Sequence, residues 1–136
     1  MRFFFYGTLL DSKLRRVVVG RDIPVVAATL PGWRRLGVAG AHYPMIQRDT
    51  SASVDGVLTD PLGGRAFARL RHYEGEGYRP LAVEVRDQGA ADIAAMVFAP
   101  PDGRLVGVGT WSLDDWQRGH RAAVLGRLAS CDWPED

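Results

Sequence analysis

The residue best suited to chemistry in this sequence is a carboxylate, Glu74, at the end of the stretch "PLGGRAFARLRHYE". The apolar spacing of this stretch predicts a helix, and at about 100° per residue Glu74 falls on the same face as Phe67 and Leu70. A carboxyl group on the core-facing side of a helix is costly to ionise unless it is paired. Desolvation raises its pKa toward the range of a general acid or base. Glu74 is therefore the first catalytic candidate.

The spacing leaves two alternatives open. Gly75 follows at once, so Glu74 could equally lie in solvent at a fraying helix end. Glu76, between Gly75 and Gly77, is a rival carboxylate beyond the predicted helix end.

A second candidate is the corner at which the opening run "FFFYGTLL" breaks. A strand that stops at Gly7 lets the chain turn sharply, and successive backbone N–H groups at such a turn can converge on an anion. The corner then forms a cradle for a carboxylate or a phosphate. The alternative is an ordinary turn from a strand into a loop.

Other common catalytic signatures are absent from the sequence, including GxSxG, GxxxxGK[ST], GxGxxG after a strand, HExxH and CxxC. His42, His72 and His120 are far apart and are predicted to be surface or loop residues. The single Cys131 excludes an internal disulfide and is predicted to be structural or incidental.

Composition predicts one domain spanning residues 1–136 in a reducing, cytoplasmic setting. The chain is 46% hydrophobic with a net charge of +1, so no overall field favours nucleic acid. The first apolar run breaks too early for a signal peptide, and no stretch is long enough for a membrane helix. Oligomeric state stays open.

The first half of the chain is predicted to contain short strands and one capped helix. Arg2 to Tyr6 is expected to form a buried strand, and Asp11 or Ser12 to cap a helix that ends before Gly20. Pro24 to Leu30 is expected to form a strand that breaks at Pro31, with Trp33 to Val38 returning as its partner.

The rest of the chain is predicted to mix strands and helices without regular alternation. A long loop is expected from residue 37 to 53, then a strand from 54 to 59. Residues 80–87, "PLAVEVRD", alternate as a half-buried strand whose hairpin partner is Asp92 to Ala99. A helix from Leu113 to about Leu128 follows the capping residue Ser112. The predicted class is α+β.

Three segments in order resemble the γ-glutamylcyclotransferase-like superfamily, including its avirulence-induced-gene-like and γ-glutamylamine cyclotransferase branches. The first is "FFFYGTLL", which matches the family's loop Tyr-Gly-[Ser/Thr]-Leu. The second is "HYPMI", which matches the family's Tyr-Pro-apolar element. The third is "LRHYEGEGYRPLAVEV", which resembles the family's Leu-Asp-x-x-Glu-Gly segment and the strand after it. The resemblance implies a small mixed β-barrel flanked by helices. One cavity is expected at the loop after the first strand.

The resemblance also implies a reaction and its residues. The α-amine of a γ-glutamyl group attacks its own γ-carbonyl, which releases an amine and closes 5-oxoproline. Glu74 matches the catalytic acid/base, and no metal or organic cofactor is implied. The backbone of Tyr6, Gly7, Thr8 and Leu9 would hold the substrate's α-carboxylate. Tyr43 and Arg79 are further candidates for the cavity lining, with core packing and a surface ion pair as their respective alternatives.

Arg71 departs from the family motif, because it replaces the Asp of Leu-Asp-x-x-Glu-Gly. This change keeps a second function class open, a module that binds a small anionic metabolite in the same cavity without turnover. A third class is an RNA-binding domain that uses the strand Phe3 to Phe5 and scattered arginines, against which the near-neutral charge argues. The leaving amine or peptide is not determined by the sequence.

Overall fold

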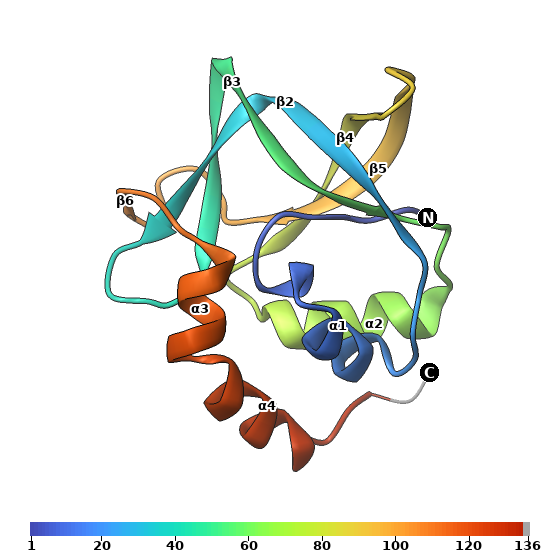
Figure 1. Cartoon of the computed structure of the whole chain (residues 1–136), viewed down its shortest axis with the longest axis vertical. Helices are drawn as coiled ribbons and strands as arrows, with labels where there is room; N and C mark the ends of the chain where they lie inside the picture. The colour runs from blue at the N-terminus through green and yellow to red at the C-terminus, as the bar shows by residue number, and fades with distance from the viewer. Residues whose placement is uncertain (135–136) are drawn as a thin grey trace.

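The structure is a computed structural model that describes residues 1–134. Its strands are β1 (Phe4–Phe5), β2 (Val25–Val38), β3 (Pro44–Thr59), β4 (Arg79–Asp87), β5 (Asp92–Ala99) and β6 (Gly107–Val108). Its helices are the 3-10 turn η1 (Thr8–Leu10), α1 (Ser12–Val19), α2 (Gly64–Glu74), α3 (Leu113–Gly119) and α4 (Arg121–Ala129). The strands occupy the upper half of Figure 1 and the helices the lower half. The predicted α+β class is confirmed.

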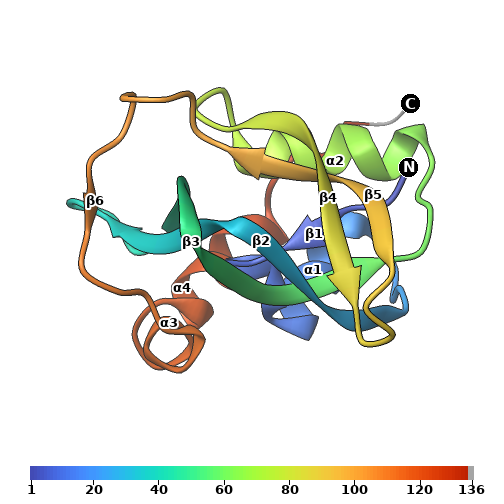
Figure 2. The same cartoon turned by 90° about the horizontal axis from the view of Figure 1, so that it is seen from above.

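The strands form one antiparallel sheet in the order β1-β3-β2-β4-β5, with β6 paired to β2. Figure 2 shows the long β2 and β3 crossing the middle of the sheet. Strand β1 meets β5 through an isolated bridge between Phe3 and Met96, not through a continuous ladder. The sheet is therefore not closed, so the expected small mixed β-barrel flanked by helices is more accurately an open antiparallel sheet flanked by helices.

Strand β2 continues through Pro31, where the sequence predicted that the strand would end. The pairing register shifts between Pro31 and Trp33, and Gly32 takes a φ of 86°. A bulge of this kind accommodates a proline that cannot donate to the ladder, so the strand bends without ending. The second half of β2 pairs with the start of β3, for example Leu36 with Met45. The predicted return strand and the long loop over 37–53 are both wrong.

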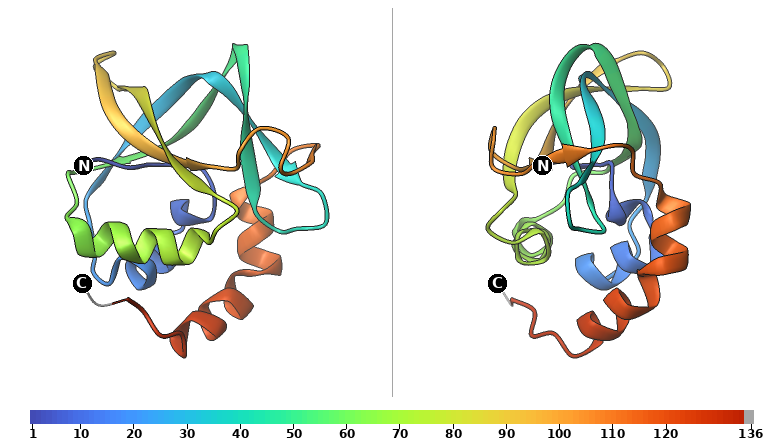
Figure 3. Two further views of the ribbon diagram at one scale, coloured as in Figure 1. Left: turned by 180° about the vertical axis from the view of Figure 1, so that it is seen from behind. Right: turned by 90° about the vertical axis from the view of Figure 1, so that its left-hand side faces the viewer.

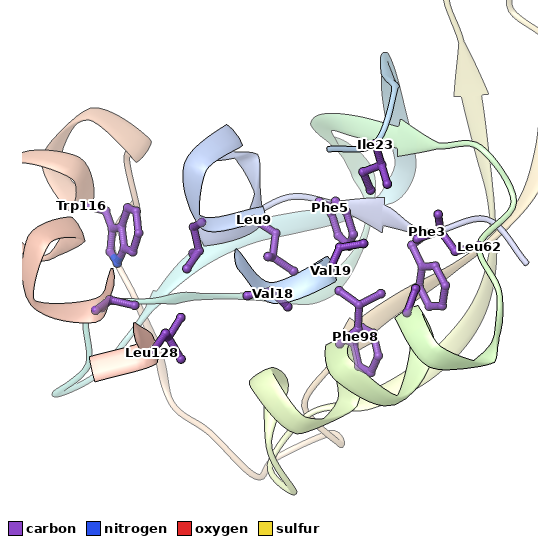
Figure 4. Close-up of a cluster of buried hydrophobic side chains, with 14 residues drawn as sticks. Phe3, Phe5, Leu9, Val18, Val19, Ile23, Leu62, Phe98, Trp116 and Leu128 are labelled. Carbon is purple, nitrogen blue, oxygen red and sulfur yellow. The ribbon is translucent and has the colours of Figure 1, made fainter. Parts of the chain in front are cut away.

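Strand β1 is buried on both of its faces. Phe3 and Phe5 point into the cluster between sheet and helices, and Phe4 and Tyr6 pack in a second cluster within the sheet. Figure 4 shows Phe3 and Phe5 beside helix-borne side chains such as Val19. Double burial explains why the strand lacks alternation. It also leaves none of these phenylalanines exposed for stacking on RNA bases, which argues against the third function class in the same way as the near-neutral charge.

Helices α1 and α2 agree with their predicted positions. Asp11 caps α1 by accepting a hydrogen bond from the Leu14 amide, at 2.8 Å, and Gly20 ends the helix with a φ of 93°. Arg69 of α2 donates to the carbonyl oxygens of Val18 (2.7 Å) and Val17 (2.8 Å) at the end of α1. The two helices are thus fixed to each other by a side chain as well as by apolar packing.

The predicted helix from Leu113 to Leu128 is two helices, which corrects the sequence expectation. His120 separates them with a φ of −135° and a ψ of −22°. The bend lets Trp116 of α3 and Leu128 of α4 both reach the core, and Figure 3 shows the two helices turning around its outer edge. Within residues 1–134 no helix has the length and apolarity needed to cross a membrane.

Replacing Gly56 by Ala should destabilise the protein by about 1–3 kcal/mol, the usual cost of overpacking a core. A Cβ atom on Gly56 of β3 would lie 2.6 Å from the ring of Phe4 and against the carbonyl oxygen of Phe5. The matched control is Gly126→Ala within α4, where nothing lies within 4 Å. That control should gain about 1 kcal/mol of helix propensity. Thermal unfolding followed by circular dichroism measures both, and an unchanged melting temperature for Gly56→Ala would contradict the packing described.

Candidate active site

A cavity of about 320 Å³ lies where the corner after β1, the end of α2 and the segment before β3 meet. Its lining residues are Phe4, Phe5, Tyr6, Gly7, Thr8, Leu9, His42, Tyr43, Pro44, Tyr73, Glu74, Gly77, Tyr78, Phe98, Leu105 and Arg127. All four tyrosines of the sequence are among them. The cavity is therefore mostly apolar and aromatic, with a small number of polar groups, as is usual for a small-molecule site.

Glu74 is the last residue of α2 and contributes a carboxylic acid to this cavity. The residue as a whole is half-buried and lines the cavity. Burial raises the pKa of Glu74 to about 8. Among residues 1–134 it has no hydrogen-bond or ion-pair partner that would lower this value. The alternative of a solvated helix end does not fit this position.

The end of α2 is held in place by its core-facing residues. Leu70, one turn before Glu74, is fully buried. The amide of Gly75 donates to the Arg71 carbonyl at 3.0 Å, and the φ of 76° at Gly75 turns the chain away from the helix axis. Glu76, the rival carboxylate, follows that turn and is exposed on a different hollow.

The corner after β1 lines the same cavity and contains backbone amides without a partner. In η1 the Leu10 amide donates to the Gly7 carbonyl (2.9 Å) and the Asp11 amide to the Thr8 carbonyl (3.0 Å). The amides of Gly7, Thr8 and Leu9 have no hydrogen-bond partner within residues 1–134. The first amides of a helical turn have no partner inside it. They are available to an anion in the cavity.

Two arginines fix the orientation of this corner. Arg35 donates to the Tyr6 carbonyl at 2.9 Å, and Arg15 donates to the Leu9 carbonyl at 3.1 Å. In a trans peptide the C=O and the following N–H point in opposite directions. The Gly7 N–H is thus directed away from Arg35. A side chain at Gly7 would also collide with Pro44, because a Cβ there would lie 2.8 Å from its Cγ.

The tyrosine hydroxyls are engaged with groups other than Glu74. Tyr6 donates to the Phe98 carbonyl and Tyr78 to the Pro44 carbonyl, each at 2.7 Å. Burial, and then the negative charge of Glu74, raises the pKa of both phenols. These phenols therefore stay protonated, and because they donate to carbonyls they do not stabilise a Glu74 carboxylate.

Tyr73 and Thr8 form a hydroxyl pair at the corner. Their oxygens are 2.7 Å apart, and one hydroxyl donates to the other. The accepting hydroxyl keeps its own hydrogen, which can be donated to a ligand oxygen. Burial raises the pKa of Tyr73, so this donor is also kept protonated. The corner thus offers a side-chain donor in addition to its amides.

The structure brings together most of the residues that the sequence singled out. Tyr43 lines the cavity with 38% of its surface exposed, so it is not packed in the core. Arg79 does not line the cavity: it is exposed on the second hollow, beside Glu76 and Tyr78. Its predicted place in the cavity lining is therefore wrong, because the β4 strand directs it to the outer side of the Gly75–Tyr78 turn.

Several lining residues were missed by sequence reasoning. Tyr73 and Arg127 come from separate helices, and their meeting depends on how α1 packs against both α2 and α4. Tyr73 carried one signal, its place on the apolar face of the predicted helix. His42 was predicted to be an ordinary loop histidine, yet it lines the cavity and stacks on His120 with ring centroids 4.7 Å apart.

The protonation of His42 is set by its neighbours. Trp116 donates its indole N–H to His42 Nδ1 at 3.1 Å, so that nitrogen carries no proton. Burial lowers the pKa of His42, and the charges of His120 and Arg127 lower it further. His42 is thus held neutral. Within the described residues no group of three or more His, Cys, Asp or Glu side chains is arranged to bind a metal ion.

Residues 3–118 match the family model described as "Gamma-glutamyl cyclotransferase, AIG2-like". The chain belongs to this family. AIG2-like protein A of Arabidopsis thaliana is 28% identical over 128 residues, which cover 90% of this chain and 75% of that protein. AIG2-like protein B of the same plant is also 28% identical and is covered over 72% of its length.

Several solved structures share the fold. A solution structure of an Arabidopsis thaliana protein superposes with a TM-score of 0.72 at 23% identity, covering 93% of this chain and 86% of that one. A structure described as "Gamma-glutamyl cyclotransferase" has a TM-score of 0.70 at 14% identity, covering 99% of this chain and 89% of that one. The fold resemblance expected from the sequence is confirmed.

The raised pKa of Glu74 should make stability depend on pH. Between the ordinary value of 4.5 and about 8, the unfolded chain ionises this carboxyl while the folded protein keeps it protonated. Wild-type stability is therefore lost progressively as pH rises through this window. Glu74→Gln, which mimics the protonated acid, should show a melting temperature advantage that is small near pH 4.5, grows toward pH 8 and then levels off.

Glu76→Gln is the matched control for this titration, because Glu76 is an exposed carboxylate two residues away. Subtracting its melting temperature difference from that of Glu74→Gln isolates the part of the effect that is specific to the cavity carboxyl. A Glu74→Gln difference that did not change with pH would show that Glu74 titrates as an ordinary solvated carboxyl.

Proposed function

We propose that this protein is a cyclotransferase that releases 5-oxoproline from a γ-glutamyl amine or peptide, with Glu74 as the general acid/base. The observation that carries the proposal is a single desolvated carboxyl with a pKa of about 8 in a cavity that also offers free backbone amides. Membership of the γ-glutamyl cyclotransferase family supports it. The substrate is a small molecule.

The reaction begins with a proton transfer. Ionised Glu74 accepts a proton from the substrate's α-ammonium, and the amine so formed attacks the γ-carbonyl carbon. A carboxyl with a pKa near the working pH serves as base and acid about equally well. After the ring has closed, protonated Glu74 gives its proton to the leaving nitrogen and the C–N bond breaks. Ionised Glu74 then takes the second hydrogen of the ring nitrogen as a proton and passes it to the released amine, which leaves as an ammonium. No water or cofactor is consumed, and Glu74 ends in its starting state.

The corner would hold the substrate's α-carboxylate so that the amine reaches its own γ-carbonyl. The amides of Gly7, Thr8 and Leu9, with the hydroxyl pair of Thr8 and Tyr73, supply donors for two carboxylate oxygens. Fixing the carboxylate restricts rotation of the glutamyl chain, which favours ring closure over other conformers. The aromatic walls exclude water that would compete for the proton.

Glu74→Gln should lower kcat/KM for 5-oxoproline release by about a hundredfold to ten-thousandfold, the usual contribution of a general acid/base. The protein is assayed against a panel of γ-glutamyl dipeptides and amines. Glu76→Gln, which changes a neighbouring carboxylate outside the cavity, should retain wild-type release. Wild-type kcat/KM should rise with pH and level off above the Glu74 pKa of about 8, since the base form is required at the first step.

A protein that released no 5-oxoproline from any member of the panel would not be this enzyme. Binding of γ-glutamyl compounds by calorimetry, unchanged in Glu74→Gln, would then establish the alternative of a non-catalytic binding module. Equal losses in Glu74→Gln and Glu76→Gln would contradict the assignment of the general base.

Gly7→Ala should raise KM at least tenfold while lowering kcat less. The added methyl group meets Pro44 and displaces the amides that are proposed to hold the α-carboxylate. Gly63→Ala, where nothing lies within 4 Å of the added atom, is the matched control. Initial-rate kinetics with a melting curve for each variant separate a binding defect from misfolding. An unchanged KM in folded Gly7→Ala would contradict the proposed role of the corner.

A further inference from the structure

Arg127 is the charged residue of the cavity that the proposed reaction does not use. Apart from histidine, the lining contains two residues whose side chains are ordinarily charged at neutral pH. They are Glu74 and Arg127. Arg127 makes no ion pair with a carboxylate of residues 1–134. Arginine remains charged at any physiological pH, and its planar fork of N–H donors fits a carboxylate.

Arg127 stands at the outer end of the cavity. It is exposed, whereas the corner residues Thr8 and Leu9 and the inner wall at Tyr6 are buried. Helix α4 is fixed in this position near its start, where the Arg121 Nε lies 3.0 Å from an Asp11 carboxyl oxygen. The Gln117 amide of α3 donates to the same Asp11 oxygen at 2.9 Å.

The charge of Arg127 affects the pKa of residues on two sides of the cavity. It lowers the pKa of His42, and it lowers that of Tyr73 against the larger effect of burial. The guanidinium therefore lies within electrostatic reach of both walls. His42 is neutral, as its bond from Trp116 requires, and Glu74 is mostly protonated below pH 8. At neutral pH the cavity consequently carries one uncompensated positive charge, at its mouth.

The reacting atoms must lie near Glu74 and the α-carboxylate at the corner, so the part of the substrate that extends toward solvent is the leaving amine. We propose that Arg127 is the specificity-determining residue for this leaving group and selects amines that carry a carboxylate, such as an amino acid or a peptide end. This inference rests on the proposed cyclotransferase function. The same charge repels leaving groups that carry a second ammonium, as a diamine does.

The test compares three substrates with one γ-glutamyl head and different charges on the leaving group. γ-Glutamyl-alanine carries a carboxylate, γ-glutamyl-alaninamide replaces it by a neutral amide of the same size, and γ-glutamyl-1,4-diaminobutane carries an ammonium. Wild type should prefer the carboxylate over the amide by about tenfold to a hundredfold in kcat/KM, the worth of one charged hydrogen bond. Added salt should reduce this preference.

Variants at Arg127 should change the order of the substrates. Arg127→Gln should remove the preference for the carboxylate over the amide, and Arg127→Glu should favour the diamine derivative. Release from γ-glutamyl-alaninamide should change little in Arg127→Gln, because its leaving group has no charge to bind. Arg21→Gln removes an exposed arginine that does not line the cavity, and it should retain the wild-type order.

Two results would overturn the inference while the cyclotransferase function stood. An unchanged carboxylate preference in Arg127→Gln would place the recognition elsewhere. An equal loss for all three substrates would mean that Arg127 binds the shared γ-glutamyl head. If wild type released no 5-oxoproline, the proposed function would fail, and calorimetric binding of γ-glutamyl-alanine against its amide would still decide the role of Arg127. In that binding experiment, the inference would be overturned if wild type bound the two compounds equally. It would also be overturned if Arg127→Gln kept the preference for γ-glutamyl-alanine.

Discussion

The site depends on keeping one carboxyl group out of water without giving it a partner. Glu74 raises the free energy of the folded protein whenever it ionises, so the elements around it must be held by other contacts. Leu70 anchors the helix in the core one turn earlier, and Arg69 ties the same helix to the carbonyls that end α1. Tyr6 and Tyr78 give their hydrogens to backbone carbonyls instead of to the acid. These contacts in the surrounding elements thus offset the free-energy cost of ionising Glu74 in the folded protein.

Local patterns predicted the parts of the molecule that local physics determines. The cap at Asp11, the end of α1 at Gly20 and the β4–β5 hairpin follow from neighbouring residues, and the structure agrees with them. The placement of Glu74 on an apolar helix face needed nothing more than the helical period. Pro31 misled the prediction because its missing donor is tolerated at a bulge, and the pairing that tolerates it comes from β3.

Contacts between distant segments were beyond sequence reasoning. Arg127 and His42 reach the cavity because α3 and α4 bend at His120 and are tied to Asp11, which no local pattern encodes.

The replacement of the family's Asp by Arg71 is explained more simply. Arg71 is exposed and lines the second hollow, so the change alters the outer side of α2 and leaves the cavity lining as it is.

The gathering of every tyrosine around one cavity also has a spectroscopic consequence. Phenol absorption and emission depend on local polarity and hydrogen bonding, and in most proteins these signals are averaged over scattered sites. Here Tyr6, Tyr43, Tyr73 and Tyr78 all line the same cavity. The near-ultraviolet tyrosine bands of this protein therefore report on what occupies the cavity, without a label and without any requirement for turnover.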